Sequence, residues 1–187
     1  MTLPSPNLIG AIFGFSELAI SLGLRVHGDA ERKDRGSLAL IWVAVMASIG
    51  LGIWLRHVAP DARLPWPQQM YPIGLALFAI GLLLRWWAII TLGRFFTVQV
   101  AIASDHRLIE NGPYRILRHP SYTGVLLELL GFALCIGNWL ALIAMVVPIL
   151  IAFGWRIHVE EIALRDAFGD AWRDYVRRTW RLLPLVY

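Results

Sequence analysis

The chain has 187 residues, of which 58% are hydrophobic and 16% are charged, and its mean hydropathy is +0.61. An average soluble domain is about 45–50% apolar and about 25% charged, so this composition excludes an ordinary soluble domain. The formal net charge is +4, but in a membrane protein basic residues first report orientation and only weakly suggest nucleic acid. The one cysteine, Cys135, lies in an apolar run, which excludes a disulfide and favours a buried thiol.

Five apolar runs predict an all-α polytopic membrane protein with a single integral membrane domain over residues 1–187. A helix needs about 20 apolar residues to cross a hydrocarbon core of roughly 30 Å, and the fourth run is short by that measure. A long polar connection precedes the fourth run, and an amphipathic segment follows the fifth. The predicted membrane helices are residues 8–24, 38–55, 72–92, 123–136 and 139–157.

Polar residues inside the early runs have two interpretations each. Glu17 would be costly at mid-bilayer, so we expect it to face other helices or to be protonated, with a functional role as the alternative. The third run begins with Pro72, which fits the first turn of a helix. Near its end, the sequence Arg85-Trp86-Trp87 is typical of a membrane boundary, since arginine snorkels and tryptophan favours the interface. A contact with a headgroup or a cofactor is the alternative for these three residues.

Basic residues predict the orientation of the chain. The connections 25–37, 56–71 and 93–122 contain four, two and four Lys or Arg residues, and six more lie from Arg156 onward. Cytoplasmic segments are enriched in Lys and Arg. The counts therefore predict that the N-terminus is outside, and that the 93–122 connection and the C-terminus are inside.

The stretch 106–124, HRLIENGPYRILRHPSYTG, is polar, basic and aromatic between apolar runs. Pro120 disfavours helix at His119, and Ser121 is a plausible N-cap of the helix that follows. A helix N-terminus suits an anionic or polar ligand. Aromatic rings can face a cation, and the stretch has two such tyrosines, Tyr114 and Tyr122. These residues predict a pocket on the cytosolic face for a zwitterionic small molecule, without naming it.

Arg156 and Glu160 are four residues apart at the inner end of the last membrane helix, so they share one helical face. They can form a mutual ion pair, or they can bind a ligand: the arginine fork suits a carboxylate or a phosphate, and the glutamate suits an ammonium. Glu161 points about 100° away, and we expect it at the surface.

The C-terminal segment from Arg156 onward has a helical apolar face, and Gly169 should break or bend it. Two interpretations stay open. The helix can lie on an anionic membrane surface, or it can also close a site against the 93–122 connection. The apolar face consists of Leu164, Phe168, Trp172 and Tyr175.

The sequence has no P-loop, GxGxxG, HExxH or Cys/His metal spacing. His106 and His119 lack a convincing third ligand, so we expect no metal.

Taken in order, four segments resemble the isoprenylcysteine carboxyl methyltransferase family of integral membrane enzymes, and the short chain is similar to its prokaryotic members. The resemblance covers about residues 84–184, with a catalytic region of about 94–184. RHPSYTG alone is less specific, because related stretches occur in phospholipid N-methyltransferases, thiol S-methyltransferases and membrane sterol reductases. The segments are FTVQVA, HRLIENGPYRILRHPSYTG, RIHVEEIALRDAFGDAWRDYV and LLP.

The resemblance implies that S-adenosylmethionine is the methyl donor and S-adenosylhomocysteine the product. It implies that Arg156 holds the carboxylate of a lipophilic, prenylcysteine-like acceptor in an inner or plasma membrane. N- or S-methylation of a lipid or a small thiol, and NADPH-dependent reduction, stay open as alternatives. The cofactor-binding residues carried over are Gln99, His106, Arg107, Leu108, Ile109, Tyr114, His119, Pro120, Ser121, Tyr122 and Glu160.

Overall fold

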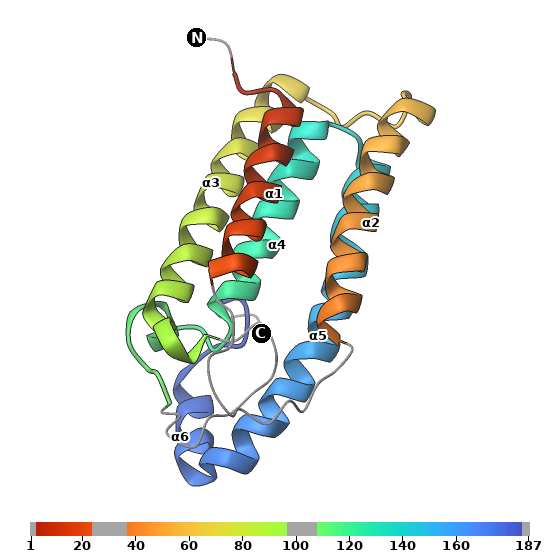
Figure 1. Ribbon diagram of the computed structural model, residues 1–187. Coiled ribbons are helices and arrows are strands. Elements are labelled where there is room, and N and C mark those ends of the chain that lie inside the picture. The colour runs from red at the N-terminus through yellow and green to blue at the C-terminus, as the bar shows by residue number, and fades with distance from the viewer. Residues whose placement is uncertain (1–2, 24–36, 97–107, 185–187) are drawn as a thin grey trace.

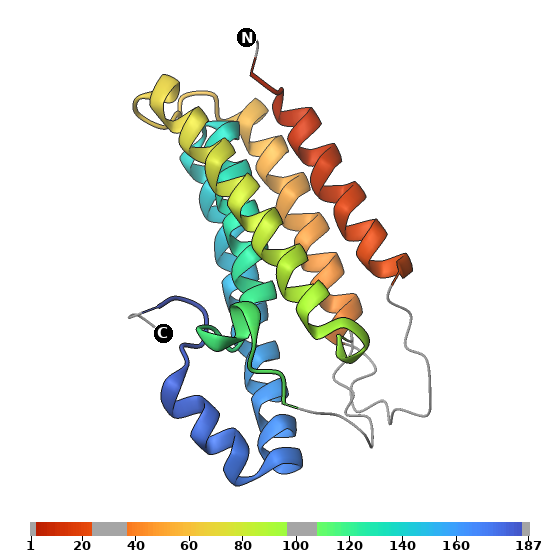
Figure 2. The ribbon, with the colours of Figure 1, turned by 90° about the vertical axis from the view of Figure 1, so that its left-hand side faces the viewer.

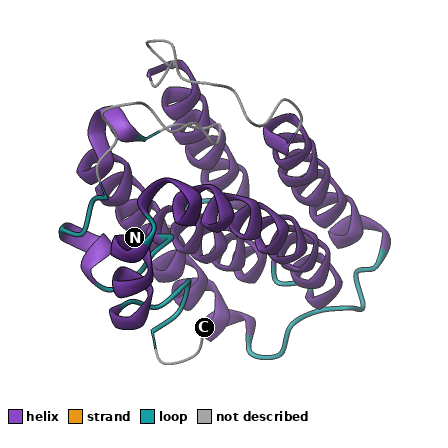
Figure 3. Ribbon diagram, turned by 90° about the horizontal axis from the view of Figure 1, so that it is seen from below, coloured by secondary structure: helices purple, strands orange, loops and turns teal. Residues whose placement is uncertain are grey.

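The computed structural model describes residues 3–23, 37–96 and 108–184, and the structural statements below refer to these ranges. They form helices, turns and loops with no strand (Figure 3), so the all-α prediction is confirmed for them. Within the described parts of the 93–122 connection lie two short 3-10 helices, η1 (Gly93–Phe95) and η2 (Gly112–Arg115). The α-helices are α1 (Pro6–Gly23), α2 (Ser37–Val58), α3 (Pro67–Leu92), α4 (Pro120–Ile136), α5 (Trp139–Phe168) and α6 (Asp170–Arg178).

Helices α1 to α5 lie alongside one another as a bundle, and α6 folds back at the end where α5 finishes (Figures 1 and 2). The most extensive contacts join α3 to α4 and α2 to α5, and α1 covers α4. Cys135 of α4 is buried, as predicted, and its Sγ lies 3.6 Å from the Tyr71 carbonyl oxygen of α3. Helix α4 begins at the end of the bundle where α5 finishes, and α6 lies at that same end (Figures 1 and 2).

Two pairs of glycines bring α3 and α4 into close contact. A Cβ atom at Gly74 would lie 2.6 Å from the Gly131 carbonyl oxygen, and one at Gly81 would lie 2.6 Å from the Gly124 carbonyl oxygen. Real Cβ atoms essentially never approach a heavy atom within 3.0 Å. Small residues permit this approach of helix backbones inside a membrane, where van der Waals packing replaces the hydrophobic effect between helices. The glycines therefore fix the position of α4 against α3.

Three helices are long and apolar enough to cross a membrane: α2, α3 and α5, with mean hydropathies of 1.6, 2.1 and 2.2 over their spans. The apolar helices α1 and α4 are shorter. Five crossings therefore stay a prediction, with α1 and α4 as the helices in question.

The helices continue past the apolar runs that predicted them. The prediction that Pro72 lies in a first turn is wrong: α3 begins at Pro67, and Pro72 lies inside it. The two polar residues Gln68 and Gln69 end the apolar run, but they do not end the helix. At the other end of the chain, α5 continues to Phe168, where its polar last turns pack against other parts of the protein, α6 among them.

Glu17 and Arg85 form a buried ion pair between α1 and α3. The distances are 2.5 Å from Arg85 Nε to Glu17 Oε1 and 2.6 Å from Nη2 to Oε2. Arg85 Nη1 also donates to Ser121 Oγ at 3.2 Å, at the start of α4. The expectation that Glu17 faces other helices is confirmed. The Arg85 head group has a carboxylate partner inside the bundle, so it need not extend to water. The position of Arg85-Trp86-Trp87 at a membrane boundary stays a prediction.

We expect Gly131→Ala to lower the thermal unfolding temperature of the protein in detergent. The new Cβ atom would lie 3.0 Å from Phe78 Cα and closer still to Phe78 N, and a helix backbone cannot yield as a flexible side chain does. Overpacking of this kind typically costs about 1–3 kcal/mol. Gly50→Ala is the matched control, since a Cβ atom there meets nothing within 4 Å. Equal unfolding temperatures for the two variants would contradict the close contact of α3 and α4.

Candidate functional site

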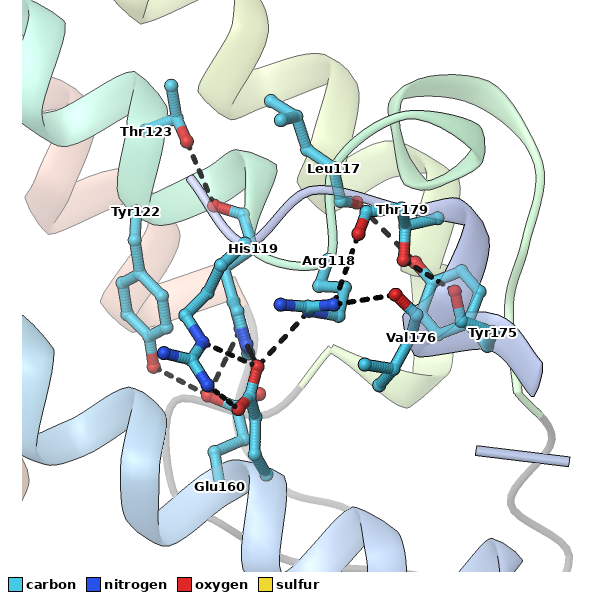
Figure 4. A network of polar contacts seen from close by, with 11 residues as sticks. Leu117, Arg118, His119, Tyr122, Thr123, Glu160, Tyr175, Val176 and Thr179 are labelled. Carbon is cyan, nitrogen blue, oxygen red and sulfur yellow. Dashed lines mark hydrogen bonds and ion pairs between the residues drawn. The ribbon is translucent and has the colours of Figure 1, made fainter. Parts of the chain in front are cut away.

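The start of α4, the end of α5 and helix α6 lie at one end of the bundle (Figure 2). Polar side chains from these segments and from the residues after α6 contact one another there. They come from three segments: the connection 108–119 with η2, the last turns of α5, and residues 170–182. Figure 4 shows the contacts among them. The site is therefore assembled from segments about twenty to sixty residues apart in the chain.

The start of α4 is set by proline. His119 is the N-cap, with φ −126° and ψ 56°, and Pro120 is the first helical residue. The non-helical conformation of His119 before proline is thus confirmed. The prediction of Ser121 as N-cap is wrong, because the proline ring fits the first helical position and moves the cap one residue earlier. Ser121 Oγ accepts from Arg85 instead.

A hydroxyl joins the arginine and the glutamate that were predicted to share one face of α5. Tyr122 Oη donates to Glu160 Oε2 at 2.9 Å and accepts from Arg156 Nε at 3.4 Å. The Tyr122 ring also packs against Phe153 and His119, with centroids 4.8 and 5.7 Å away. Arg156 is 3% exposed, whereas the Glu160 side chain is 31% exposed. The shared face is confirmed. Of its two charged groups, the Glu160 carboxylate is the one that a dissolved ligand can reach.

Glu161 is not at the surface, and that prediction is wrong. It is buried, and its Oε1 lies 3.2 Å from Arg118 Nε, 3.3 Å from His119 Nε2 and 3.1 Å from Arg181 Nε. Its Oε2 accepts from Arg181 Nη2 at 2.7 Å. The face of α5 that lies 100° from Glu160 is covered by the start of α4 and by the residues after α6. The prediction failed because it considered the faces of α5 alone, without the segments that pack against them.

Residues 179–182, which we call the C-terminal strap, run beside the chain that enters α4. The backbone N–H of Arg118 donates to the Trp180 carbonyl at 2.7 Å, and that of His119 donates to the Arg181 carbonyl at 3.2 Å. These bonds hold the strap in place through main-chain atoms. They also satisfy donors just before the helix, where no intrahelical partner exists.

Helix α6 packs against the described part of the 93–122 connection. This contact was predicted by the second interpretation of the C-terminal segment, and it is confirmed. Gly169, at φ 54°, separates α5 from α6 as predicted. Tyr175 Oη donates to the Tyr114 carbonyl at 2.7 Å, and Arg118 Nη1 donates to the Val176 carbonyl at 3.1 Å. Both tyrosines are buried, and α6 is therefore a wall of the site.

Burial, and then the charge of Glu160, raises the pKa of the Tyr114 phenol well above its usual value. Burial, and then the charge of Glu110, does the same to the pKa of Tyr175. Both phenols therefore stay protonated at neutral pH.

The structure brings His119, Tyr122, Arg156 and Glu160 together. Tyr114 is buried in η2, where its carbonyl accepts from Tyr175. Ser121 and Pro120 are buried in the first turn of α4, and Leu108 and Ile109 are half-buried in the connection. Three other predicted site residues lie outside the described residues: Gln99, His106 and Arg107. The described ranges contain no group of three or more His, Cys, Asp or Glu side chains placed to hold a metal ion.

Sequence reasoning missed Arg118, Glu161 and Arg181. The first two stand directly beside predicted residues, in Arg118-His119 and Glu160-Glu161. Two adjacent ionisable residues in so apolar a chain could have indicated that both belong to the polar cluster. Arg181 follows α6 in an extended segment, where no periodicity points to its partner.

The described residues define a class: an all-helical bundle with apolar helices of membrane-spanning length and a cluster of polar side chains at one end. A sequence model described as the isoprenylcysteine carboxyl methyltransferase (ICMT) family matches residues 73–166. Protein-S-isoprenylcysteine O-methyltransferase B of Arabidopsis thaliana is 32% identical, over 94% of this chain and 90% of the plant protein. Its relative A is 34% identical, over 97% and 93%. The chain belongs to the isoprenylcysteine carboxyl methyltransferase family.

A probable protein-S-isoprenylcysteine O-methyltransferase of Oryza sativa subsp. indica is 34% identical, over 61% of this chain and 61% of the rice protein. A solved structure, of the eukaryotic intramembrane Ras methyltransferase ICMT, has a TM-score of 0.72 and 29% identity. It is matched over 95% of this chain and 64% of its own length. The chain thus spans less than two thirds of these two relatives. The family confirms a polytopic membrane protein and implies a methyl donor.

We expect Tyr175→Phe to loosen α6 from the connection. The change keeps the ring but removes the O–H that donates to the buried Tyr114 carbonyl, a loss that costs about 1–3 kcal/mol. The unfolding temperature in detergent should fall, and α6 should be cut faster by a protease. Arg173→Ala is the control on the same helix, since its ion pair with Asp170 is exposed. If Tyr175→Phe matched wild type in both measurements, the docking of α6 would not depend on this bond.

Proposed function

We propose that this protein is a methyltransferase that uses S-adenosylmethionine to methylate the carboxylate of a lipophilic, prenylcysteine-like acceptor. The observation that carries the proposal is the buried Arg156 and the accessible Glu160, joined by the Tyr122 hydroxyl in the half of the chain where the family matches. The named relatives are protein-S-isoprenylcysteine O-methyltransferases. This family membership favours methyl transfer over NADPH-dependent reduction.

The residues of the site fit the donor by their chemistry. Glu160 presents a partly exposed carboxylate, which suits the ammonium of the methionine part. His119 and Tyr122 place aromatic rings beside the Glu160 carboxylate, and such rings attract a cation such as a sulfonium. Tyr114 is proposed for the same site as a buried residue of η2. The N-terminus of α4 favours a carboxylate or other polar group. The remaining residues proposed for the donor are Gln99, His106, Arg107, Leu108, Ile109, Pro120 and Ser121.

Arg156 suits the carboxylate of the acceptor. It is buried in α5, where its guanidinium attracts a carboxylate more strongly than it would in water. On the same helix, Ile151 and Trp155 are 70% and 66% exposed, as expected for side chains that face lipid. A lipophilic tail can therefore remain in the bilayer while its polar end reaches Arg156. This arrangement supports an acceptor that is anionic at one end and apolar at the other.

When bound, S-adenosylmethionine supplies a methyl group on a positively charged sulfur. An ionised carboxylate oxygen is itself a nucleophile, so no general base is required of the protein. Its bond to the methyl carbon forms while the carbon–sulfur bond breaks, and the electron pair of that bond stays on sulfur. The task of Arg156 and Glu160 is then to hold the two reactants in line and away from water. Alignment of this kind lowers a barrier by up to roughly 7–11 kcal/mol in model systems.

We also propose that the site faces the cytosol, with the N-terminus outside and the C-terminus inside, in an inner or plasma membrane. The Lys and Arg residues support this orientation, since ten of them lie in the 93–122 connection and from Arg156 onward. The described part of the connection lies at the same end of the bundle as α6 (Figure 1). The donor can then reach Glu160 from the aqueous side.

Calorimetry on the purified protein tests the function. Wild type should bind both S-adenosylmethionine and S-adenosylhomocysteine, and the absence of heat with either would refute the proposal. Arg156→Ala should leave donor affinity within about threefold of wild type, under ~1 kcal/mol. It should lower kcat by about 10²–10³, because the acceptor carboxylate loses its charged partner.

Arg165→Ala is the matched control, since Arg165 lies on the same helix and is exposed. Its donor affinity and turnover should both match wild type. Loss of donor binding in Arg156→Ala would assign Arg156 to the donor instead of the acceptor, and unchanged turnover would remove it from the site.

A further inference from the structure

We infer that Arg181 and Glu161 are positioning residues for the donor site, so that the C-terminal strap belongs to the catalytic apparatus. Arg181 holds Glu161, Glu161 holds His119, and His119 lies against Tyr122 in the site described above. The inference rests on the proposed function, because it takes His119 and Glu160 as donor-binding residues.

Two arginines and a histidine surround the Glu161 carboxylate. One carboxylate receives Arg181 through two of its nitrogens, at 3.1 and 2.7 Å, and Arg118 at 3.2 Å. A buried charge is stable only when it is paired and hydrogen-bonded. The Arg118 guanidinium depends on the same pairing, because burial lowers its pKa and the charge of Glu161 opposes that effect. The cluster therefore keeps its geometry as a unit, and removing one cation redistributes the others around the carboxylate.

The two adjacent glutamates of α5 have divided roles around one imidazole. Glu161 Oε1 lies 3.3 Å from His119 Nε2, whereas Glu160 Oε2 lies 3.9 Å from His119 Nδ1. A carboxylate accepts hydrogen bonds, so Nε2 carries a proton toward Glu161. In the neutral imidazole this leaves Nδ1 as an acceptor on the side of Glu160, where an N–H donor of the ligand can bind. Glu161 thus sets the orientation and the tautomer of a ring that faces the ligand.

Arg181 is well suited to fix Glu161, since a guanidinium binds a carboxylate through two nitrogens in one plane. The strap that carries it does not rely on this side chain for its attachment. The Thr123 hydroxyl donates to the Leu182 carbonyl at 2.7 Å, and the His119 N–H donates to the Arg181 carbonyl at 3.2 Å. Because these bonds use main-chain atoms of the strap, shortening the Arg181 side chain should leave the strap docked. This separates positioning from folding.

The test measures Arg181→Ala, Arg181→Lys and Glu161→Gln for affinity to S-adenosylhomocysteine by calorimetry, for KM and kcat, and for unfolding temperature in detergent. Arg181→Ala should weaken product affinity and raise the KM for S-adenosylmethionine by about tenfold or more, with a smaller change in kcat. Its unfolding temperature should stay close to that of wild type. Arg181→Lys should recover only part of the affinity, because lysine offers a point charge without the fork.

A double-mutant cycle supplies the second readout. If Arg181 acts through Glu161, then Arg181→Ala should have little further effect on affinity in the Glu161→Gln background. The control is Arg177→Ala, since Arg177 is 80% exposed and its ion pair with Asp174 is at the surface. Arg177→Ala should match wild type in every measurement.

Three results would overturn the inference while leaving the proposed function intact: wild-type donor affinity and KM in Arg181→Ala, a fall in unfolding temperature with no change in affinity, or fully additive effects in the cycle. Failure of the wild-type protein to bind either compound would be a different outcome. It would refute the proposed function itself.

Discussion

A single buried carboxylate, that of Glu161, joins three parts of the chain that are far apart in sequence. It lies on α5, and its partners Arg118, His119 and Arg181 come from the entrance to α4 and from the C-terminal strap. Leaving such a charge unpaired away from water would be strongly destabilising, by about 3–5 kcal/mol for a buried pair. The pairing requirement therefore ties α5 to the entrance of α4 through Arg118 and His119. Arg181 adds a contact from the strap, which main-chain bonds already hold in place. The neighbouring Glu160 faces the opposite side of His119, where it stays accessible to a ligand.

That arrangement needs a fixed starting point for α4, and the membrane part of the molecule provides it. The glycine pairs of α3 and α4 set how closely these helices approach, and Arg85 reaches from α3 to Ser121 in the first turn of α4. Glu17 of α1 neutralises Arg85. The first turn of α4 therefore receives contacts from the bundle on one side and from the strap on the other. A rigid helix start of this kind is what a site needs if two reactants are to be held in line.

Local pattern predicted what depends on neighbours in sequence. The helices, the break at Gly169 and the shared face of Arg156 and Glu160 follow from hydropathy, glycine and the 3.6-residue period. The motifs around RHPSYTG indicated the family. Sequence patterns did not predict contacts between residues that are far apart in the chain. Arg85 stands in a sequence typical of a membrane boundary, but the carboxylate that it binds belongs to Glu17, 68 residues away. Glu161 has the position of a surface residue on α5, but a covering segment arrives 20 residues later.

We propose that the entrance to α4 and the end of α5 form the two halves of one site for the methyl donor. An experimental structure of the full chain in a lipid environment, with S-adenosylhomocysteine bound, tests it most directly. We predict ligand density between the two halves, in contact with His119 or Tyr114 on one side and with Glu160 on the other. Density that touched only one half, or that lay elsewhere in the bundle, would contradict the account.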